Sequence, residues 1–260
     1  MSTQAAPSGG GGRVIALVIE YDGTRYHGFQ RQPDAPSIAR EVEDALATLL
    51  RHPVQLVAAG RTDAGVHATG QVVSFTTASD LDIRRFPIAL SALLRDRDIA
   101  VVRAADRAPG FSARFDALAR TYRYRILNRI APSPLDRDRV YHVSAALDVN
   151  AMRAALQSFP GEHDFGAFTT SEQQGSTRRR VESAAIEHDG ENITIEMTAD
   201  SFLHHMVRLV TGTLVRVGRG ETSVDAVARL VASAARGSSR PLLAPAHGLY
   251  LTYVRYADPI

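Results

Sequence analysis

One short segment of the sequence brings together several residue types that can do chemistry. Gly60–His67 places the carboxylate of Asp63 between two glycines and close to the cation of Arg61. The segment lies between two apolar runs typical of strands, and loops carried by rigid strands often hold catalytic groups. Its glycines would let other atoms approach the backbone closely. Asp63 is therefore the leading candidate for a reactive acid, and an ordinary turn with a surface Arg–Asp pair is the alternative.

The surroundings of Asp63 would decide its chemistry, because a carboxylate can act as a base, a nucleophile or a charge stabiliser. Arg61 would keep the carboxylate ionised if the two side chains form a partly buried pair. Tyr122 is a second candidate, because it lies in a strongly basic stretch where an aromatic ring can stack on a base. Ordinary packing on a strand is its alternative role. His67 has no obvious partner, and we interpret it as a hydrogen-bonding residue of the loop.

A lone charge in an apolar segment is the third candidate. Phe202–Val217 has the pattern of a buried helix, and Arg208 lies within it. A buried guanidinium needs a partner, which would be an acid in a cleft or a substrate phosphate. His204 and His205 would point about 100° apart on such a helix and would not chelate one metal ion. With no cysteine and no HExxH motif, the sequence predicts no metal site.

The composition narrows the chemistry further. All 30 basic residues are arginines, and the chain has no cysteine. Schiff-base, P-loop lysine and thiolate chemistry are thereby excluded, and no glycine-rich nucleotide motif is present, so we expect no cofactor. Residues 111–129 carry five arginines and one acid, and Arg178–Arg180 form a second cluster. Guanidinium groups suit phosphates and bases, whereas a solvated basic face is the alternative.

The chain shows no sign of a membrane span or a signal peptide. No apolar run reaches the roughly 18 residues that a spanning helix needs. Residues 1–12 are rich in glycine, serine and alanine and lack the basic-then-apolar order of a secretory signal. We therefore expect a flexible tail over 1–12 and a cytoplasmic protein.

Hydrophobic periodicity predicts the same order of elements twice. The first half contains a strand at 14–21, a helix at 37–50, strands at 54–59 and 71–76, a helix at 84–94 and a strand at 99–103. The second half contains a strand at 121–127, a helix at 150–159, a hairpin at 181–188 and 193–199, helices at 202–217 and 224–235, and a strand at 248–256.

Two βαββαβ units predict an α+β fold of two tandem ferredoxin-like halves. We expect mostly antiparallel sheets with helices on one face and a cleft on the other. The turn formers Pro109-Gly110 place the boundary between a domain at 13–108 and a domain at 109–260. Open sheet faces of this kind can bind a folded RNA.

Beyond these patterns, the sequence resembles the tRNA pseudouridine synthase A family from about Val14 to Tyr256. The most specific match is the Gly60–His67 block. The other matching segments are Glu20–Gly23, Gly28–Gln32, Thr69–Val73, Phe111–Phe115, Arg120–Tyr124, Phe202–Arg208 and Gly248–Leu251.

This resemblance implies isomerisation of uridine to pseudouridine at positions 38, 39 and 40 in the anticodon stem-loop of tRNA. It also implies that no cofactor is used and that a homodimer binds the tRNA with both subunits. By resemblance, Asp63 would be the catalytic aspartate, Arg61 would help to displace the target base, and Tyr122 would pack on that base. Arg114 and Arg208 would hold the acid and the RNA.

Two segments and one single residue depart from the family pattern. Ser91–Arg95 replaces an Asn-x-x-Leu-Pro run, Ala167–Thr169 stands where the family usually has Ser/Ala-Phe followed by a basic or polar residue, and Phe29 stands where tryptophan is common. None of them touches the Asp63 loop, but they leave open which uridines are chosen. The sequence also leaves open whether Asp63 adds to the sugar or acts as a base, and which group handles the C5 proton.

Three other functions remain as alternatives. The first is a non-catalytic RNA-binding protein on the same fold, and the second is a paralogue that modifies other uridines. The third is a metal-dependent hydrolase that uses Asp63, His67 and the histidine pair His204-His205.

Overall fold

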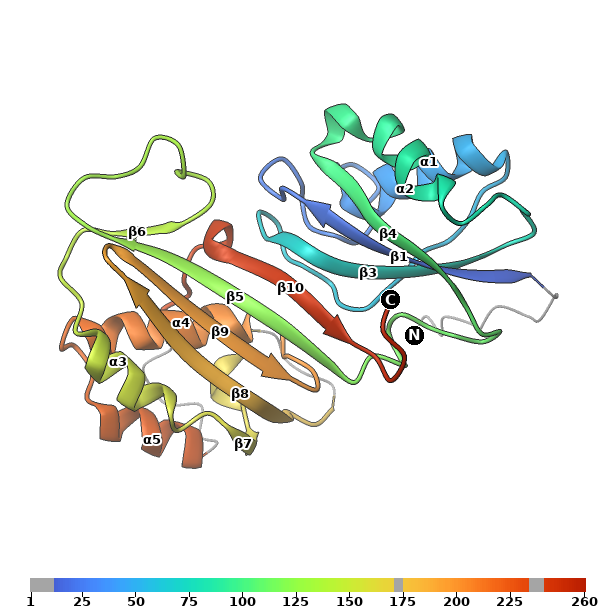
Figure 1. Ribbon diagram of the computed structural model, residues 1–260. Coiled ribbons are helices and arrows are strands. Elements are labelled where there is room, and N and C mark those ends of the chain that lie inside the picture. Colours follow the sequence, from blue (N-terminus) through green and yellow to red (C-terminus); the bar gives the residue numbers. More distant parts are fainter. Residues whose placement is uncertain (1–11, 171–174, 234–240) are drawn as a thin grey trace.

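The computed structural model of the protein describes residues 12–170, 175–233 and 241–260. The predicted tail, residues 1–12, lies outside these ranges except for residue 12. The described part is a mixed α+β fold in which ten strands form one mostly antiparallel sheet and five α-helices pack against it (Figure 1). No helix in these ranges is long and apolar enough to cross a membrane.

The elements follow one another along the chain as the periodicity predicts, with two short additions. The strands are β1 (Arg13–Tyr21), β2 (Val57–Ala58), β3 (His67–Thr77), β4 (Ile99–Arg107), β5 (Ala119–Asn128), β6 (Tyr141–Val143), β7 (Gly161–Asp164), β8 (Arg178–Asp189), β9 (Asn192–Ala199) and β10 (Leu249–Arg255). The α-helices are α1 (Ile38–Leu50), α2 (Arg85–Leu93), α3 (Val149–Leu156), α4 (Met206–Gly218) and α5 (Val224–Ser233).

Several boundaries differ from the expected ones for local reasons. The strand expected at 54–59 is reduced to β2, because the backbone N–H of Leu56 donates to the side chain of Glu43 at 3.2 Å rather than to a neighbouring strand. The helix expected from Phe202 begins only at Met206, because His205 has the left-handed φ of 64°. The short strands β6 and β7 were not predicted, since three or four residues are too few to show a period.

A single sheet spans both halves of the chain, where the sequence predicts a separate sheet in each. Its strand order is β4-β1-β3-β10-β5-β9-β8-β7, with β2 paired to β3 and β6 paired to β5. The halves meet where β10, the last strand, runs parallel to β3 and pairs Tyr250 with His67 and Leu251 with Ala68. On its other edge β10 is antiparallel to β5. The C-terminal strand therefore joins the two halves.

Helices cover each half of the sheet. Figure 1 shows α1 and α2 against the strands of the first half, and α3, α4 and α5 against those of the second. Helix α1 buries one face, made of Ile38, Ala39, Val42, Ala45, Leu46 and Leu50. Helix α4 is buried almost all round, which is typical of a helix packed between a sheet and other helices.

The joint between the halves depends on one glycine. A Cβ atom added to Gly70 on β3 would lie 2.1 Å from the carbonyl oxygen of Thr252 on β10. Because that oxygen belongs to a strand backbone, it cannot move aside as a side chain could. Close approach of the two strands therefore requires glycine at this position.

We predict that Gly70→Ala weakens this joint. It should lower the free energy of unfolding by about 3 kcal/mol, because the added methyl group overpacks a strand backbone. Urea denaturation followed by circular dichroism would measure the change. Gly60→Ala is the matched control, since its Cβ would meet only the Tyr122 hydroxyl, at 3.6 Å. Equal stability of the two variants would contradict the role given to Gly70.

Candidate active site

The loop that carries Asp63 connects β2 to β3, and hydrogen bonds fix its start. The side chain of Arg120 donates to the carbonyl of Ala59 through Nε at 3.1 Å and through Nη2 at 2.9 Å. The amide of Gln71 donates to the carbonyl of Gly60 at 2.7 Å. Arg120 lies on β5, so the loop is tied to both halves of the protein.

Further contacts hold the middle of the loop. The carbonyl of Thr62 accepts the N–H of Phe29 at 3.0 Å, and its hydroxyl is hydrogen-bonded to the buried phenol of Tyr21 at 2.8 Å. The N–H of Val66 donates to the carbonyl of Asp63 at 3.1 Å, which closes a tight turn. Gly65 supplies the φ of 76° that this turn needs. The backbone around Asp63 is therefore fixed before any substrate binds.

Asp63 projects into a small cavity of about 90 Å³ that both halves of the protein line. The first half contributes Arg61–Asp63 and Val66, and the second contributes Tyr122, Phe202–Val207 and Leu249. A larger cavity of about 440 Å³ lies elsewhere, beside Gly161 and Arg180–Glu182. The smaller cavity is the candidate active site, because the candidate acid Asp63 and the candidate aromatic residue Tyr122 meet there.

Arg208 reaches the acid from the second half. Its Nη1 donates to Oδ2 of Asp63 at 3.3 Å, and its Nε donates to the carbonyl of Ala244 at 2.8 Å. The Arg208 side chain is 12% exposed and that of Asp63 is 28% exposed, so the pair is partly shielded from water. Asp63 is therefore the acidic partner that Arg208, the lone charge on α4, was expected to need.

The histidine pair lies on the other side of the carboxylate. Nε2 of His205 is 3.3 Å from Oδ2 of Asp63, and Nε2 of His204 is 3.6 Å from Oδ1. The two rings are stacked, with their centroids 3.7 Å apart. The expectation that the rings diverge on a helix is wrong, because both residues precede α4. Sequence periodicity extended the helix four residues too far and so concealed this cluster.

A hydrogen-bonded cluster fits these residues better than a metal site does. Asp63, His204 and His205 present nitrogen and oxygen atoms within 4.8 Å of one another, a separation that would suit a metal ion. The guanidinium of Arg208, however, already donates to the same carboxylate. Its positive charge would repel a divalent cation at this distance.

Burial sets the protonation of two groups that line the cavity. It raises the pKa of Tyr122, and the nearby Tyr21 and Asp63 raise it further, so the phenol stays protonated. The Tyr122 ring packs edge-on against Phe202, with centroids 5.0 Å apart. Burial lowers the pKa of His205, although Asp63 opposes the shift, which favours a neutral imidazole near pH 7.

The two remaining predicted site residues lie farther from the acid. Arg61 lines the cavity but is exposed, and no ion pair joins it to Asp63 in the described structure. The condition under which Arg61 would keep Asp63 ionised, a partly buried pair of the two side chains, is therefore not met, and Arg208 is the arginine paired with the acid. Arg114 is exposed outside the cavity lining, with its guanidinium 5.4 Å from the centre of the Phe115 ring. The arginine that reaches the loop is Arg120, which sequence analysis did not single out.

His67 is a hydrogen-bonding structural residue, as interpreted from the sequence, although its partners could not be identified there. Its buried ring accepts the N–H of Gly23 at Nδ1, 3.1 Å away, and its Nε2 faces the carbonyls of Asp138 at 3.0 Å and His247 at 3.1 Å. The ring also stacks on Tyr250, with centroids 4.7 Å apart. Both ring nitrogens are thus engaged away from Asp63, which argues against a hydrolase built on these two residues.

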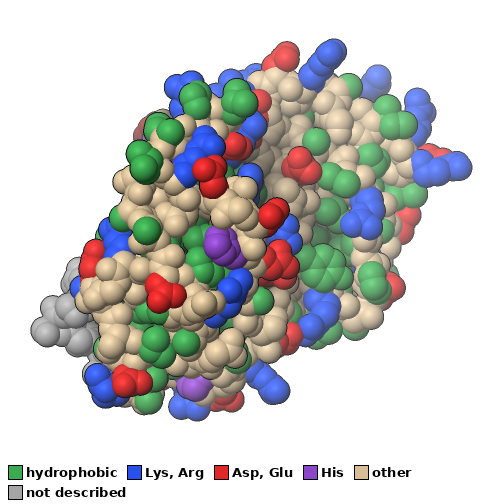
Figure 2. Space-filling model, turned by 60° about the vertical axis from the view of Figure 1, so that its left-hand side comes forward, with side chains coloured by type: hydrophobic (Ala, Val, Ile, Leu, Met, Phe, Trp, Pro, Cys, Tyr) green, Lys and Arg blue, Asp and Glu red, His purple; other side chains and the backbone are tan. Residues whose placement is uncertain are grey.

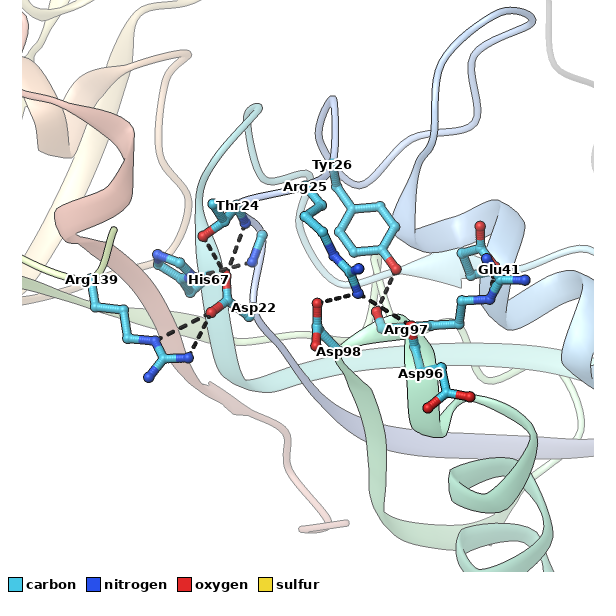
Figure 3. Close-up of polar contacts among 11 residues, drawn as sticks. Asp22, Thr24, Arg25, Tyr26, Glu41, His67, Asp96, Arg97, Asp98 and Arg139 are labelled. Carbon is cyan, nitrogen blue, oxygen red and sulfur yellow. Dashed lines mark hydrogen bonds and ion pairs between the residues drawn. The ribbon is translucent and has the colours of Figure 1, made fainter. Parts of the chain in front are cut away.

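Asp22 extends the same contact between the halves. In Figure 3 its carboxylate lies between Thr24, His67 and Arg139. Nε and Nη2 of Arg139 donate to Oδ2 of Asp22 at 3.2 and 3.1 Å. Burial raises the pKa of Asp22, but the hydrogen bonds from Thr24 and Arg139 and the nearby His67 together outweigh it, and the net shift is downward. The ionised carboxylate therefore ties the loop after β1 to the segment before β6.

Acidic side chains accompany several of the surface arginines. Within the basic segment 111–129, Arg123 pairs with Glu196 at 2.9 Å and Arg129 pairs with Glu191 at 3.0 Å. Figure 2 shows basic and acidic side chains interspersed over the visible face. Acidic side chains from elsewhere in the chain therefore neutralise part of the positive charge of residues 111–129 in the folded protein.

Comparisons with known proteins agree on one family. A family model described as tRNA pseudouridine synthase matches residues 17–116 and 155–257. The chain is 44% identical over 245 residues to tRNA pseudouridine synthase A of Geotalea uraniireducens, covering 94% of this chain and 100% of that protein. The protein of the same name from Geobacter sulfurreducens is 45% identical with coverage of 94% and 100%, and that from Rhodospirillum centenum is 42% identical with coverage of 92% and 98%.

One solved structure is similar to this chain only to a low degree. A chain of a Cbf5-Nop10-Gar1 complex aligns with 78% of this chain and 44% of its own length at 10% identity, with a TM-score of only 0.34. The sequence relatives are decisive because they extend over nearly the whole chain. The chain therefore belongs to the tRNA pseudouridine synthase family, whose members are isomerases that act on uridine.

Proposed function

We propose that this protein converts uridine to pseudouridine at positions 38, 39 and 40 in the anticodon stem-loop of tRNA, with Asp63 as the catalytic carboxylate and without a cofactor. The observation that carries the proposal is the position of Asp63. The carboxylate projects from a fixed loop into a cavity shared by both halves, where Arg208 donates to it at 3.3 Å. Membership of the family supplies the reaction class.

The geometry supports a role for each neighbour in this reaction. A target uridine must leave the helical stack before its sugar can reach Asp63, which costs a few kcal/mol. Arg61, exposed at the cavity and unpaired with Asp63, is placed to take the position of the departing base. Tyr122 offers a neutral phenol ring on which the extruded base can pack. Arg208 holds the carboxylate towards C1′ and C2′, where it would either add to the sugar or remove the C2′ proton.

We further propose that each half is a ferredoxin-like unit, one at residues 13–108 and the other at 109–260. In support, the first half has the order β4-β1-β3-β2 and the second has the equivalent order β10-β5-β9-β8. By resemblance to the family, two copies would bind one tRNA in the cytoplasm. Arg114 is proposed as an RNA contact, because it lies exposed beside Phe115, a ring that is 80% exposed.

The first prediction concerns Asp63. Asp63→Asn should reduce pseudouridine formation by at least about 10³-fold, because the amide can neither add to the sugar nor take a proton at a useful rate. Tritium release from tRNA labelled at C5 of uridine would measure turnover, with and without a chelator. Unchanged tRNA binding and circular dichroism would show that the variant is folded.

Two outcomes would contradict this assignment. Turnover retained by folded Asp63→Asn would remove Asp63 from catalysis. If the wild-type protein bound tRNA in a salt-dependent manner but released no tritium, the non-catalytic RNA-binding alternative would hold. We expect the chelator to have no effect, since the cluster around Asp63 is hydrogen-bonded and includes Arg208.

Arg61→Ala tests the displacement step. We expect turnover to fall more at positions 39 and 40, which are paired in the stem, than at position 38, because a paired base costs more to extrude. Arg229→Ala is the matched control, since Arg229 is also exposed but lies on α5. Stability should change by no more than about 0.5 kcal/mol in either variant. Mapping pseudouridine at single nucleotides would reveal the pattern, and equal slowing at all three positions would argue against this role for Arg61.

A further inference from the structure

A single hydroxyl group joins the two stacked histidines on the side away from Asp63. Oγ1 of Thr170 lies 2.6 Å from Nδ1 of His205 and 3.1 Å from Nδ1 of His204. On the other side of the same rings, both Nε2 atoms face the Asp63 carboxylate. The two imidazoles therefore share one hydroxyl at Nδ1 and one carboxylate at Nε2.

The hydroxyl constrains the protons on the two rings. It has one proton to donate, so it can donate to only one Nδ1 and must accept from the other. With both imidazoles uncharged, one ring then carries its proton on Nδ1 and the other on Nε2. In that state the two rings are opposite tautomers at the cavity: one Nε2 carries no proton and can act as a base, and the other carries an N–H and can act as an acid.

The isomerisation needs both functions at once. Uridine loses the C1′–N1 bond and the proton on C5, and pseudouridine gains the C1′–C5 bond and a proton on N1. A proton must therefore leave C5 and another must reach N1, with no net change. Asp63 is proposed to act at the sugar, so a different group has to carry these protons.

We propose that His204 and His205 are the acid and base of this step and that Thr170 relays the proton between them, an inference that rests on the proposed function. The bare Nε2 of one ring takes the proton from C5, and the Nε2–H of the other ring gives its proton to N1. The Nδ1–H of the first ring passes to the Thr170 oxygen, whose own proton passes to Nδ1 of the second.

The relay returns to an equivalent state after each turnover. The ring that began as the base ends with its proton on Nε2, and the ring that began as the acid ends with its proton on Nδ1. The hydroxyl proton of Thr170 has moved from one side to the other. The pair is then ready for the next uridine with the roles of His204 and His205 exchanged, and neither ring stays doubly protonated or loses both protons.

Single-turnover kinetics on tRNA carrying hydrogen or deuterium at C5 of uridine test this proposal. We expect His204→Gln and His205→Gln to slow pseudouridine formation on the order of 10²-fold, the size of a typical acid–base contribution. They should also raise the C5 isotope effect above the wild-type value, because removal of the C5 proton becomes limiting. A purely structural role for the histidines would leave the isotope effect unchanged.

Two threonine variants and one histidine control complete the experiment. Thr170→Val keeps the shape but removes the hydroxyl, and we expect it to slow the reaction and raise the isotope effect, whereas Thr170→Ser should restore both values. His188→Gln, an exposed histidine on β8, should match the wild type. Wild-type isotope effects in folded histidine variants, or full activity of Thr170→Val, would overturn the relay. Absence of pseudouridine with the wild-type protein would instead overturn the proposed function.

Discussion

The pairing of β3 with β10 is the constraint on which the rest of the structure depends. The loop that carries Asp63 enters β3, and Arg208 lies on α4 in the half of the chain that β10 completes. The two residues are 145 positions apart in sequence, yet the guanidinium donates to the carboxylate at 3.3 Å. Only the close approach of the two strands, which Gly70 permits, brings these groups into one cavity.

The contacts around the β3–β10 joint serve mainly to fix the place of Asp63, and they add less to the stability of the fold. Arg120 on β5 and Gln71 on β3 fix the carbonyls at the start of the loop, so both halves determine where Asp63 lies. His67 performs a similar task at the end of the loop, where its ring reaches Asp138 and His247 of the second half. A partly buried ion pair such as Asp63–Arg208 adds little net stability, because removing its charges from water is costly. Its value lies in the fixed orientation of the carboxylate.

Periodicity and local motifs predicted much of the fold and part of the site. The order of the main elements follows from hydrophobic patterns, and Gly60–His67 marked the loop because glycines, an acid and an arginine rarely occur together between two strands. Arg208 was identifiable because one charge within an apolar helix needs a partner. Each of these signals is contained in a few neighbouring residues.

The missed features depend on contacts between residues that are distant in sequence. Arg120 reaches the loop across 61 positions, and Thr170 reaches the histidines across 34 and 35 positions. The start of α4 was misplaced because periodicity does not register the left-handed backbone of His205, and this error alone hid the stacked pair. Likewise, the continuous sheet could not be predicted, because no local pattern indicates which strand edges will meet.

The structure of the protein bound to an anticodon stem-loop would test the central claim most directly. The account predicts that the target uridine leaves the stack and that its C1′ or C2′ atom lies about 3–3.5 Å from the Asp63 carboxylate, a distance suited to reaction. It also predicts that Arg208 still donates to that carboxylate. A uridine that stays stacked, or a sugar bound far from Asp63 with another side chain against C1′, would contradict the account.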